Sequence, residues 1–208
     1  MKRRSKVLTA ALAAMMCLGL VACGKEFDAA GYTKSVLDAN YHEEYAKYAE
    51  FRNLSEKEAA KEIEDNRTAL AERELTGIGE PTEEEIAAYV ASTKTLEKLA
   101  KYEVKEAKEQ EDGSYIVTVE ITPSLVYTKI EENSAALTEE MIAAGESPLE
   151  SEQAFFKLLN ESIARAVEAN EYDEPTTFEV KVTADESGAY GIDESQMADI
   201  QDALFIQP

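Results

Sequence analysis

One stretch in the middle of the sequence, DGSYIVTVEITP (residues 112–123), decides the fold of this chain of 208 residues. From Tyr115 to Thr122 apolar side chains alternate with polar ones, which is the period of a strand with one buried face. The Asp-Gly pair in front of it is a strong signal for a β-hairpin turn. We therefore expect an earlier strand, beginning near Val104, to pair with this one, and Pro123 to end the pair.

Before this hairpin the spacing of apolar residues is helical. The capping box Ser55–Glu58 predicts a helix that runs to about Leu75, and a second box at Thr82–Glu85 predicts another through Leu99. Upstream of both, six residues recur at steps of three to five and predict one amphipathic helix. They are Tyr32, Val36, Leu37, Tyr41, Tyr45 and Tyr48.

After Pro123 two helices are expected, over residues 125–144 and 150–168. A second alternating strand follows, with Phe178, Val180 and Val182 on its inner face, and then a turn at residues 185–188. A short strand at 190–192 and a last helix capped by residues 193–196 complete the chain. Strands with one apolar face predict an α+β fold, rich in helix, with several amphipathic helices packed on one face of a small antiparallel sheet. No linker or repeat divides residues 29–208, so we expect a single globular domain.

The charge balance excludes one class of partner. The chain has 43 acidic and 21 basic residues, a formal charge of −22 and a pI near 4.4. Nucleic-acid binding depends on Lys and Arg side chains that neutralise phosphates, so nucleic acid is not expected as a partner. The same charge opposes electrostatic docking on anionic lipid.

The first 22 residues have the layout of a secretory signal peptide. Four basic residues within positions 2–6 precede an uncharged run over residues 7–22. That run is shorter than the roughly 20 apolar residues that span a bilayer as a helix.

The run ends at Leu20-Val21-Ala22-Cys23, which resembles the lipobox of bacterial lipoproteins. The resemblance implies cleavage between Ala22 and Cys23, a diacylglycerol on the Cys23 sulfur, and attachment to the extracytoplasmic face of the cell membrane. Cys17 does not fit, because the large Met16 precedes it. Cleavage would remove four basic residues and no acidic one, so the mature charge would become −26. Two acyl chains suffice for stable anchoring, and residues 23–28 would form a short tether of about 15–20 Å.

A second resemblance covers residues 30–75. The pattern Tyr32-x-x-x-Val36-Leu37-Asp38-Ala39-x-Tyr41-x-x-x-Tyr45, followed by the Ser55 box, is similar to the start of small lipoproteins of uncharacterised function from Gram-positive bacteria. Proteins of that kind are sometimes compared with NTF2-like cups, although the long helices expected after Pro123 depart from an NTF2-like order. The resemblance supplies no catalytic residues.

Catalytic and metal-binding patterns are weak. His42 is the only histidine, and we interpret it as a solvated residue on a helix flank, although a general base is the alternative. One His without a free Cys does not make a usual zinc site, and the segment from Asp185 to Asp193 fails the EF-hand template. We therefore predict no metal, no cofactor and no catalytic residue.

Two features keep a binding role open. Tyr41, Tyr45 and Tyr48 either line a cavity or pack in the core. The outward sheet face is either a binding surface or a plain solvated face; it is formed by Thr118, Glu120, Thr122, Glu179, Lys181 and Thr183.

The leading hypothesis is a lipid-anchored, non-catalytic domain that binds an unknown protein or small molecule. The alternatives are a carboxylate-dependent envelope hydrolase and a purely structural envelope protein. The hydrolase would need two buried acids that face each other in a pocket, one of them with a raised pKa.

Overall fold

The structure is a computed structural model that describes residues 27–77, 79–147 and 150–208. Within them one antiparallel sheet has the strand order β1-β2-β3-β4, in which each strand pairs with the next in the chain. The strands are β1 (Lys101–Glu109), β2 (Tyr115–Thr122), β3 (Thr176–Ala184) and β4 (Tyr190–Gly191). The predicted signal peptide, Cys23 and most of the predicted tether lie outside the described residues.

Strand β2 is the centre of the core. Its odd-numbered side chains are buried and its even-numbered ones are partly exposed, as the alternation predicts. Val117 lies opposite Val180 and Val119 opposite Phe178, so β3 presents the same apolar face. The hairpin turn occurs at the predicted Asp-Gly pair, where Gly113 has a φ of +78° that suits glycine.

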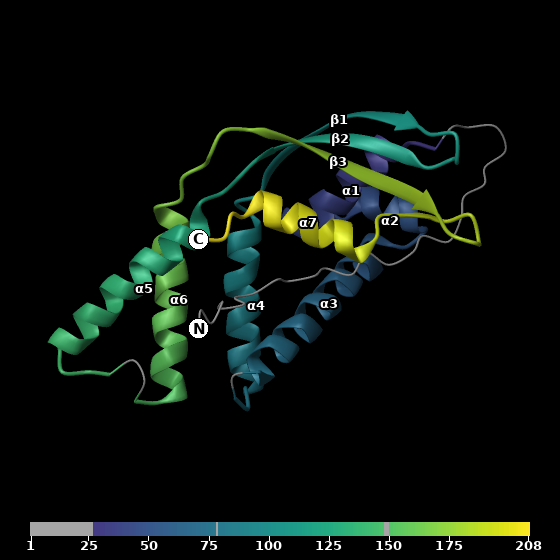
Figure 1. Cartoon of the computed structure of the whole chain (residues 1–208). Coiled ribbons are helices and arrows are strands. Elements are labelled where there is room, and N and C mark those ends of the chain that lie inside the picture. The colour runs from purple at the N-terminus through teal and green to yellow at the C-terminus, as the bar shows by residue number, and fades with distance from the viewer. Residues whose placement is uncertain (1–26, 78, 148–149) are drawn as a thin grey trace, which may run out of the picture.

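Three helices cover the apolar face of the sheet (Figure 1). They are α1 (Ala29–Tyr41), α2 (Ala46–Arg52) and α7 (Glu194–Leu204). Helix α7 begins as predicted, with the Asp193 side chain accepting a hydrogen bond from the Gln196 amide.

The expectation of one continuous helix from Tyr32 to Tyr48 is wrong. The helix ends at Tyr41 and a second begins at Ala46, because Glu43 adopts a left-handed conformation with a φ of +58°. The Glu43 carboxylate forms two ion pairs, one from Oε1 to Lys94 Nζ at 2.6 Å and one from Oε2 to Lys98 Nζ at 2.5 Å. Both lysines lie near the end of the fourth helix. These contacts hold the carboxylate in place, and their hydrogen bonds lower the pKa of Glu43 to about 2.

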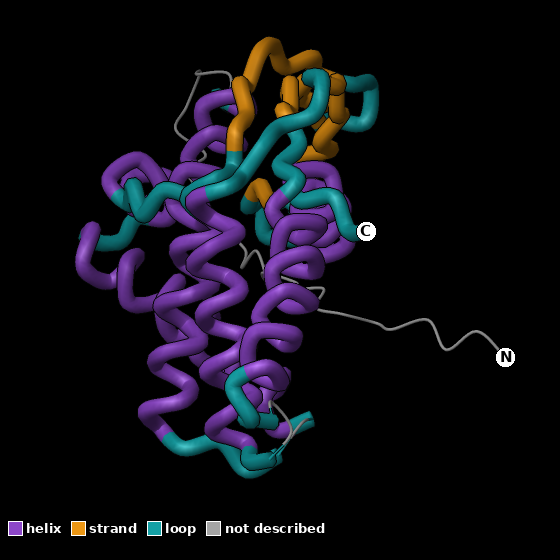
Figure 2. The backbone as a smooth tube through the Cα atoms, turned by 90° about the vertical axis from the view of Figure 1, so that its left-hand side faces the viewer, coloured by secondary structure: helices purple, strands orange, loops and turns teal. Residues whose placement is uncertain are grey.

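The other four helices form two hairpins that extend away from the sheet (Figure 2). Helices α3 (Glu56–Thr76) and α4 (Glu83–Glu97) both begin with the predicted capping boxes, at Ser55 and Thr82. Helices α5 (Val126–Ala143) and α6 (Glu152–Glu168) pack against each other, and α6 also contacts α4.

The predicted fold class is confirmed: helices pack on one face of a small antiparallel sheet in an α+β arrangement. The main core cluster joins β2 and β3 to α1, α2 and α7, and a smaller cluster lies between α3 and α4. No helix in the described part of the chain combines the length and apolar character needed to cross a bilayer.

Candidate functional site

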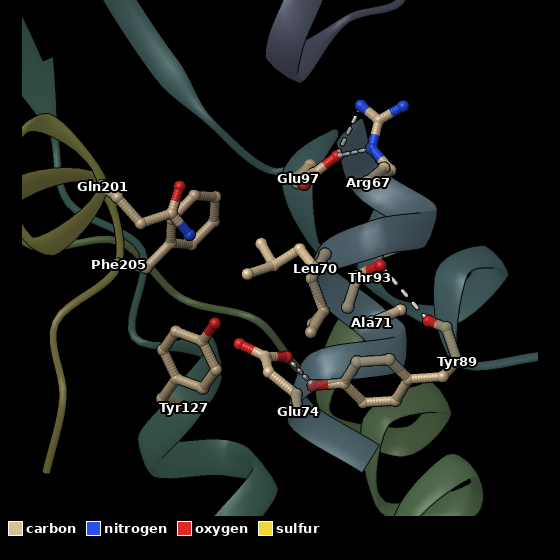
Figure 3. A pocket seen from close by; sticks show the side chains of 11 residues that line it. Arg67, Leu70, Ala71, Glu74, Tyr89, Thr93, Glu97, Tyr127, Gln201 and Phe205 are labelled. Carbon is tan, nitrogen blue, oxygen red and sulfur yellow. Dashed lines mark hydrogen bonds and ion pairs between the residues drawn. The ribbon is translucent and has the colours of Figure 1, made fainter. Parts of the chain in front are cut away.

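A small pocket with polar groups at both ends lies where α3, α4 and α7 meet the first turn of α5 (Figure 3). It offers about 30 Å³ to the centres of water molecules, which is room for one or two waters or one small polar group. Its lining residues are Arg67, Leu70, Ala71, Glu74, Tyr89, Thr93, Leu96, Glu97, Tyr127, Gln201 and Phe205.

Helix α3 supplies one wall because of the spacing of its residues. Its buried residues repeat at every fourth position, which places them in one row along the helix. They are Ala59, Ile63, Arg67, Ala71 and Leu75. Leu70 lies three residues after Arg67, and Glu74 lies four residues after Leu70, so both border this row. Both also line the pocket.

Arg67 and Glu97 form a buried ion pair at one end of the pocket. Their side chains are 3% and 9% exposed, and the Arg67 Nε and Nη2 atoms lie 2.9 and 2.8 Å from Glu97 Oε2. Arg67 Nη2 also donates to the backbone oxygen of Asn40 at 2.8 Å. Burial raises the pKa of Glu97 and the Arg67 guanidinium offsets part of that rise. Burial acts to lower the pKa of Arg67, but Glu97 outweighs it and the net pKa of Arg67 is raised. The pair is satisfied within the protein and joins α3 to α4.

Glu74 stands at the other end of the pocket. Its Oε2 accepts a hydrogen bond from the Tyr89 hydroxyl at 2.9 Å. In Figure 3 the other carboxylate oxygen points toward Tyr127. Burial raises the pKa of Glu74, and the Tyr89 hydroxyl and Arg73 only partly oppose this effect. Burial, together with the charge of Glu74, raises the pKa of Tyr127 to about 12, so this hydroxyl stays neutral at physiological pH.

Gln201 orients a hydrogen-bond donor toward the same end. Its Oε1 accepts from the Tyr41 hydroxyl at 2.9 Å, so the amide nitrogen is on the opposite side. Figure 3 shows that nitrogen on the side of Tyr127. The pocket thus has an ion-paired end, an apolar middle and an end with a carboxyl, a phenol and an amide.

The two acidic side chains of the pocket do not face each other. Glu97 is held by Arg67, and Glu74 lies seven residues further along α3, which is about 10 Å along the helix axis. Figure 3 shows Leu70 between the two ends. Paired-carboxylate hydrolysis needs both groups to flank one bond, so this arrangement does not favour the hydrolase alternative. None of the described lining residues is a histidine, cysteine or serine.

Of the two arrangements expected for the three tyrosines, cavity lining or core packing, the structure has them in the main core cluster or packed against it. Tyr41 is buried, and its hydroxyl donates a hydrogen bond to Gln201. Tyr45 is half-buried, and its charge interaction and hydrogen bond with Arg67 help to raise the pKa of Arg67. Tyr48 is buried and its hydroxyl donates to Glu62 at 3.3 Å. None of the three appears among the described lining residues, so they support the site rather than form it.

The predicted surface on the sheet lies on the outer face of β2 and β3. Thr118 pairs with Glu179, while Lys181 pairs with Ile116. Lys181 Nζ lies 3.3 Å from Asp112, and Glu120 lies 3.6 Å from Lys105 Nζ. These are ion pairs of a solvated face, and a binding role for Thr118, Glu120 and Lys181 stays a prediction.

His42 caps the end of α1, where its amide donates to the Asp38 oxygen at 2.9 Å and its ring lies against Tyr102. The structure thus places it on a helix flank, away from the pocket. Within the described ranges no group of three or more His, Cys, Asp or Glu side chains is placed to hold a metal ion.

The sequence contains one signal for this site. Arg67 falls on the apolar row of α3, between Ile63 and Ala71, and a charge in such a row implies a buried partner. The convergence of Glu74, Tyr89 and Tyr127 had no comparable signal, because these residues lie on three helices that meet only through tertiary packing.

The chain resembles a known protein in fold. No protein-family model matches the sequence, and no curated protein sequence matches it significantly. The crystal structure of "a putative lipoprotein (ycdA)" from Bacillus subtilis has a similar fold, with a TM-score of 0.61 and 14% identity. The likeness covers 86% of this chain and 56% of that one, so this chain spans about half the length of its structural neighbour. At this identity the likeness is one of fold.

Proposed function

We propose that the protein is a lipid-anchored, extracytoplasmic, non-catalytic binding protein. Three observations support the anchor: the basic start, the apolar run over residues 7–22, and the lipobox-like Leu20-Val21-Ala22-Cys23. The structural neighbour, itself described as a putative lipoprotein, adds support through the fold. The membrane partner is reached through the diacylglycerol on Cys23.

The anchor is tested by expressing the full chain in a Gram-positive host and analysing the membrane fraction. We expect the mature protein to begin at Cys23 and to carry the mass of a diacylglycerol, and Cys23→Ala to leave the precursor uncleaved. Cys17→Ala is the matched control and should leave processing unchanged. A wild-type protein released without lipid would contradict the proposal.

For the ligand, we infer that the pocket receives a small positively charged group, such as a primary amine. The observation that carries this inference is the make-up of the lining: Arg67 and Glu97 form an ion pair, so Glu74 is a partly buried carboxyl that no cation among the lining residues neutralises. Desolvation makes that charge costly, and a cation beside it would lower the cost. The Tyr127 hydroxyl lies beside it, and its oxygen can accept a hydrogen bond from an ammonium group.

The amine inference is tested by calorimetry and thermal unfolding with a panel of small amines, including amino sugars and lysine-containing peptides. A ligand at about 100 times its Kd stabilises by roughly 2.7 kcal/mol, so a clear rise in Tm is expected for at least one amine. Glu74→Gln keeps a group that accepts from Tyr89 but removes the charge, and should abolish the effect. Glu72→Gln, on the exposed face of α3, is the matched control and should retain it.

Two outcomes would contradict the amine inference. One is a flat response of the wild type to every amine in the panel. The other is a response that is as large in Glu74→Gln as in the wild type.

A further inference from the structure

The chain is fixed to the folded body from Phe27 onward. The Phe27 ring stacks on Tyr190 with 4.0 Å between centroids, and it packs against Tyr32, Phe51 and Tyr115 at 5.7–6.1 Å. The next residue, Asp28, caps α1 by accepting a hydrogen bond from the Gly31 amide at 2.8 Å. A ring held by four others does not act as part of a loose tether.

This aromatic cluster lies at the turn end of the sheet. Tyr115 is the first residue of β2, next to the β1–β2 turn, and the Tyr190 hydroxyl donates to the Gly113 oxygen within that turn. The ends of the two helical hairpins, near residues 79–82 and 144–147, lie at the other end of the molecule (Figure 1). Helix α3, with 21 residues, alone spans about 31 Å.

We propose that the turn end of the sheet faces the lipid headgroups and that the helical hairpins point away from the membrane. This rests on the proposed lipid on Cys23. Only four residue steps separate Cys23 from Phe27, a reach of about 13–15 Å even when fully extended. With an attachment point that close, the body cannot point its helical end at the bilayer without pushing that end into it.

The charge of this end argues against adsorption as the cause of membrane attachment. The two turns carry a group of acidic residues, which anionic headgroups repel. They are Glu109, Glu111, Asp112, Asp185 and Glu186. We therefore expect the folded domain without lipid to bind vesicles of anionic lipid no better than background.

The orientation is tested with the lipidated full chain in vesicles. After cleavage Cys23 is the only cysteine and its sulfur carries the lipid, so an introduced cysteine is the only free thiol. Donor dyes are placed on Glu111→Cys and Glu186→Cys at the sheet turns, and on Glu80→Cys and Glu146→Cys at the helical ends; all four positions are exposed. Energy transfer to acceptor-labelled headgroups should be severalfold higher from the two turn positions.

A flexible Gly-Ser insertion after Lys25 provides the matched control. It lengthens the connection without touching the folded body, and we expect the difference between the two ends to shrink strongly. Persistence of the full difference would show that the sheet end docks by its own affinity, which overturns the short-tether argument.

The outcomes separate this inference from the anchor. A protein that carries the lipid by mass but transfers energy equally from both ends, or more from the helical ends, overturns the orientation alone. A protein without the lipid overturns the anchor and the orientation with it.

Discussion

Strand β2 and helix α5 follow each other in the chain, separated only by Pro123–Leu125, yet they bury their side chains very differently. Strand β2 is paired on both edges and buries every second residue. Helix α5 packs mainly on α6 and buries only Val126 and Leu137 among its 18 residues. Ile142, near its end, is 63% exposed. The comparison indicates a well-packed body around the sheet and a helical arm, α5–α6, in which α6 joins the core through Ile163 and Ala166 while α5 is only weakly held.

The pocket lies at the boundary between these two regions. Tyr127 belongs to the first turn of α5, which the body holds through the pairing of Ser124 with Tyr172 and Phe205. The other lining residues belong to α3, α4 and α7 or, for Phe205, directly follow α7. A ligand at this boundary would contact both the rigid body and the base of the arm.

The largest effect is expected from breaking the buried ion pair. Arg67→Met leaves the Glu97 carboxylate buried without its partner, which should lower the free energy of unfolding by about 3–5 kcal/mol at pH 7. Denaturant unfolding measures the change. Arg165→Met removes the ion pairs of Arg165 with Glu140 and Glu161 on the arm, where the groups are solvent-exposed, and should produce no measurable change.

The stability of Arg67→Met should also depend on pH in a distinctive way. Burial raises the pKa of Glu97 above its ordinary value of 4.5, and loss of Arg67 raises it further. The folded state then binds a proton more tightly than the unfolded state, so the loss of stability grows as the pH rises above 4.5 and is relieved as the pH falls. A deficit of stability that stays constant between pH 4 and 8 would contradict this explanation.

A second pair of variants compares the two regions through apolar burial. Ile121 in β2 is 0% exposed, and Ile121→Ala should cost about 2–5 kcal/mol because it leaves a cavity in the core. Ile142→Ala, the same substitution on the arm, should change the stability by less than about 0.5 kcal/mol. Similar losses for both would mean that the arm is packed as firmly as the sheet.

The sequence predicted best the features that depend on neighbouring residues. The alternation of β2, the hairpin at Gly113 and the caps at Ser55, Thr82 and Asp193 all occur where local spacing placed them. The break at Glu43 was not predictable in this way, because it depends on Lys94 and Lys98, far away in the sequence, while the tyrosine stripe continues across it. For the same reason the pocket was missed, since only packing brings Glu74, Tyr89 and Tyr127 together.

The smallest loss of stability is expected at the break between α1 and α2. Glu43→Gln removes the ion pairs to Lys94 and Lys98, and should lower the free energy of unfolding by no more than about 1 kcal/mol at pH 7 because the groups remain partly in water. The pKa of Glu43 is lowered from 4.5 to about 2, so its stabilising effect is complete above pH 4.5 and is lost as the pH falls through 2. Variant and wild type should therefore differ at pH 7 and converge near pH 2. A difference that persists unchanged at pH 2 would show that the charge of Glu43 does not matter.

Amide hydrogen exchange followed by mass spectrometry tests the contrast between body and arm most directly. We expect peptides of β2, β3 and the pocket wall of α3 to exchange only through global unfolding, and peptides of residues 131–143 to exchange much faster through local opening of the arm. The first turn of α5, which contains Tyr127, should behave like the body. Equal protection of β2 and of residues 131–143 would contradict the account, because the arm would then unfold only together with the sheet.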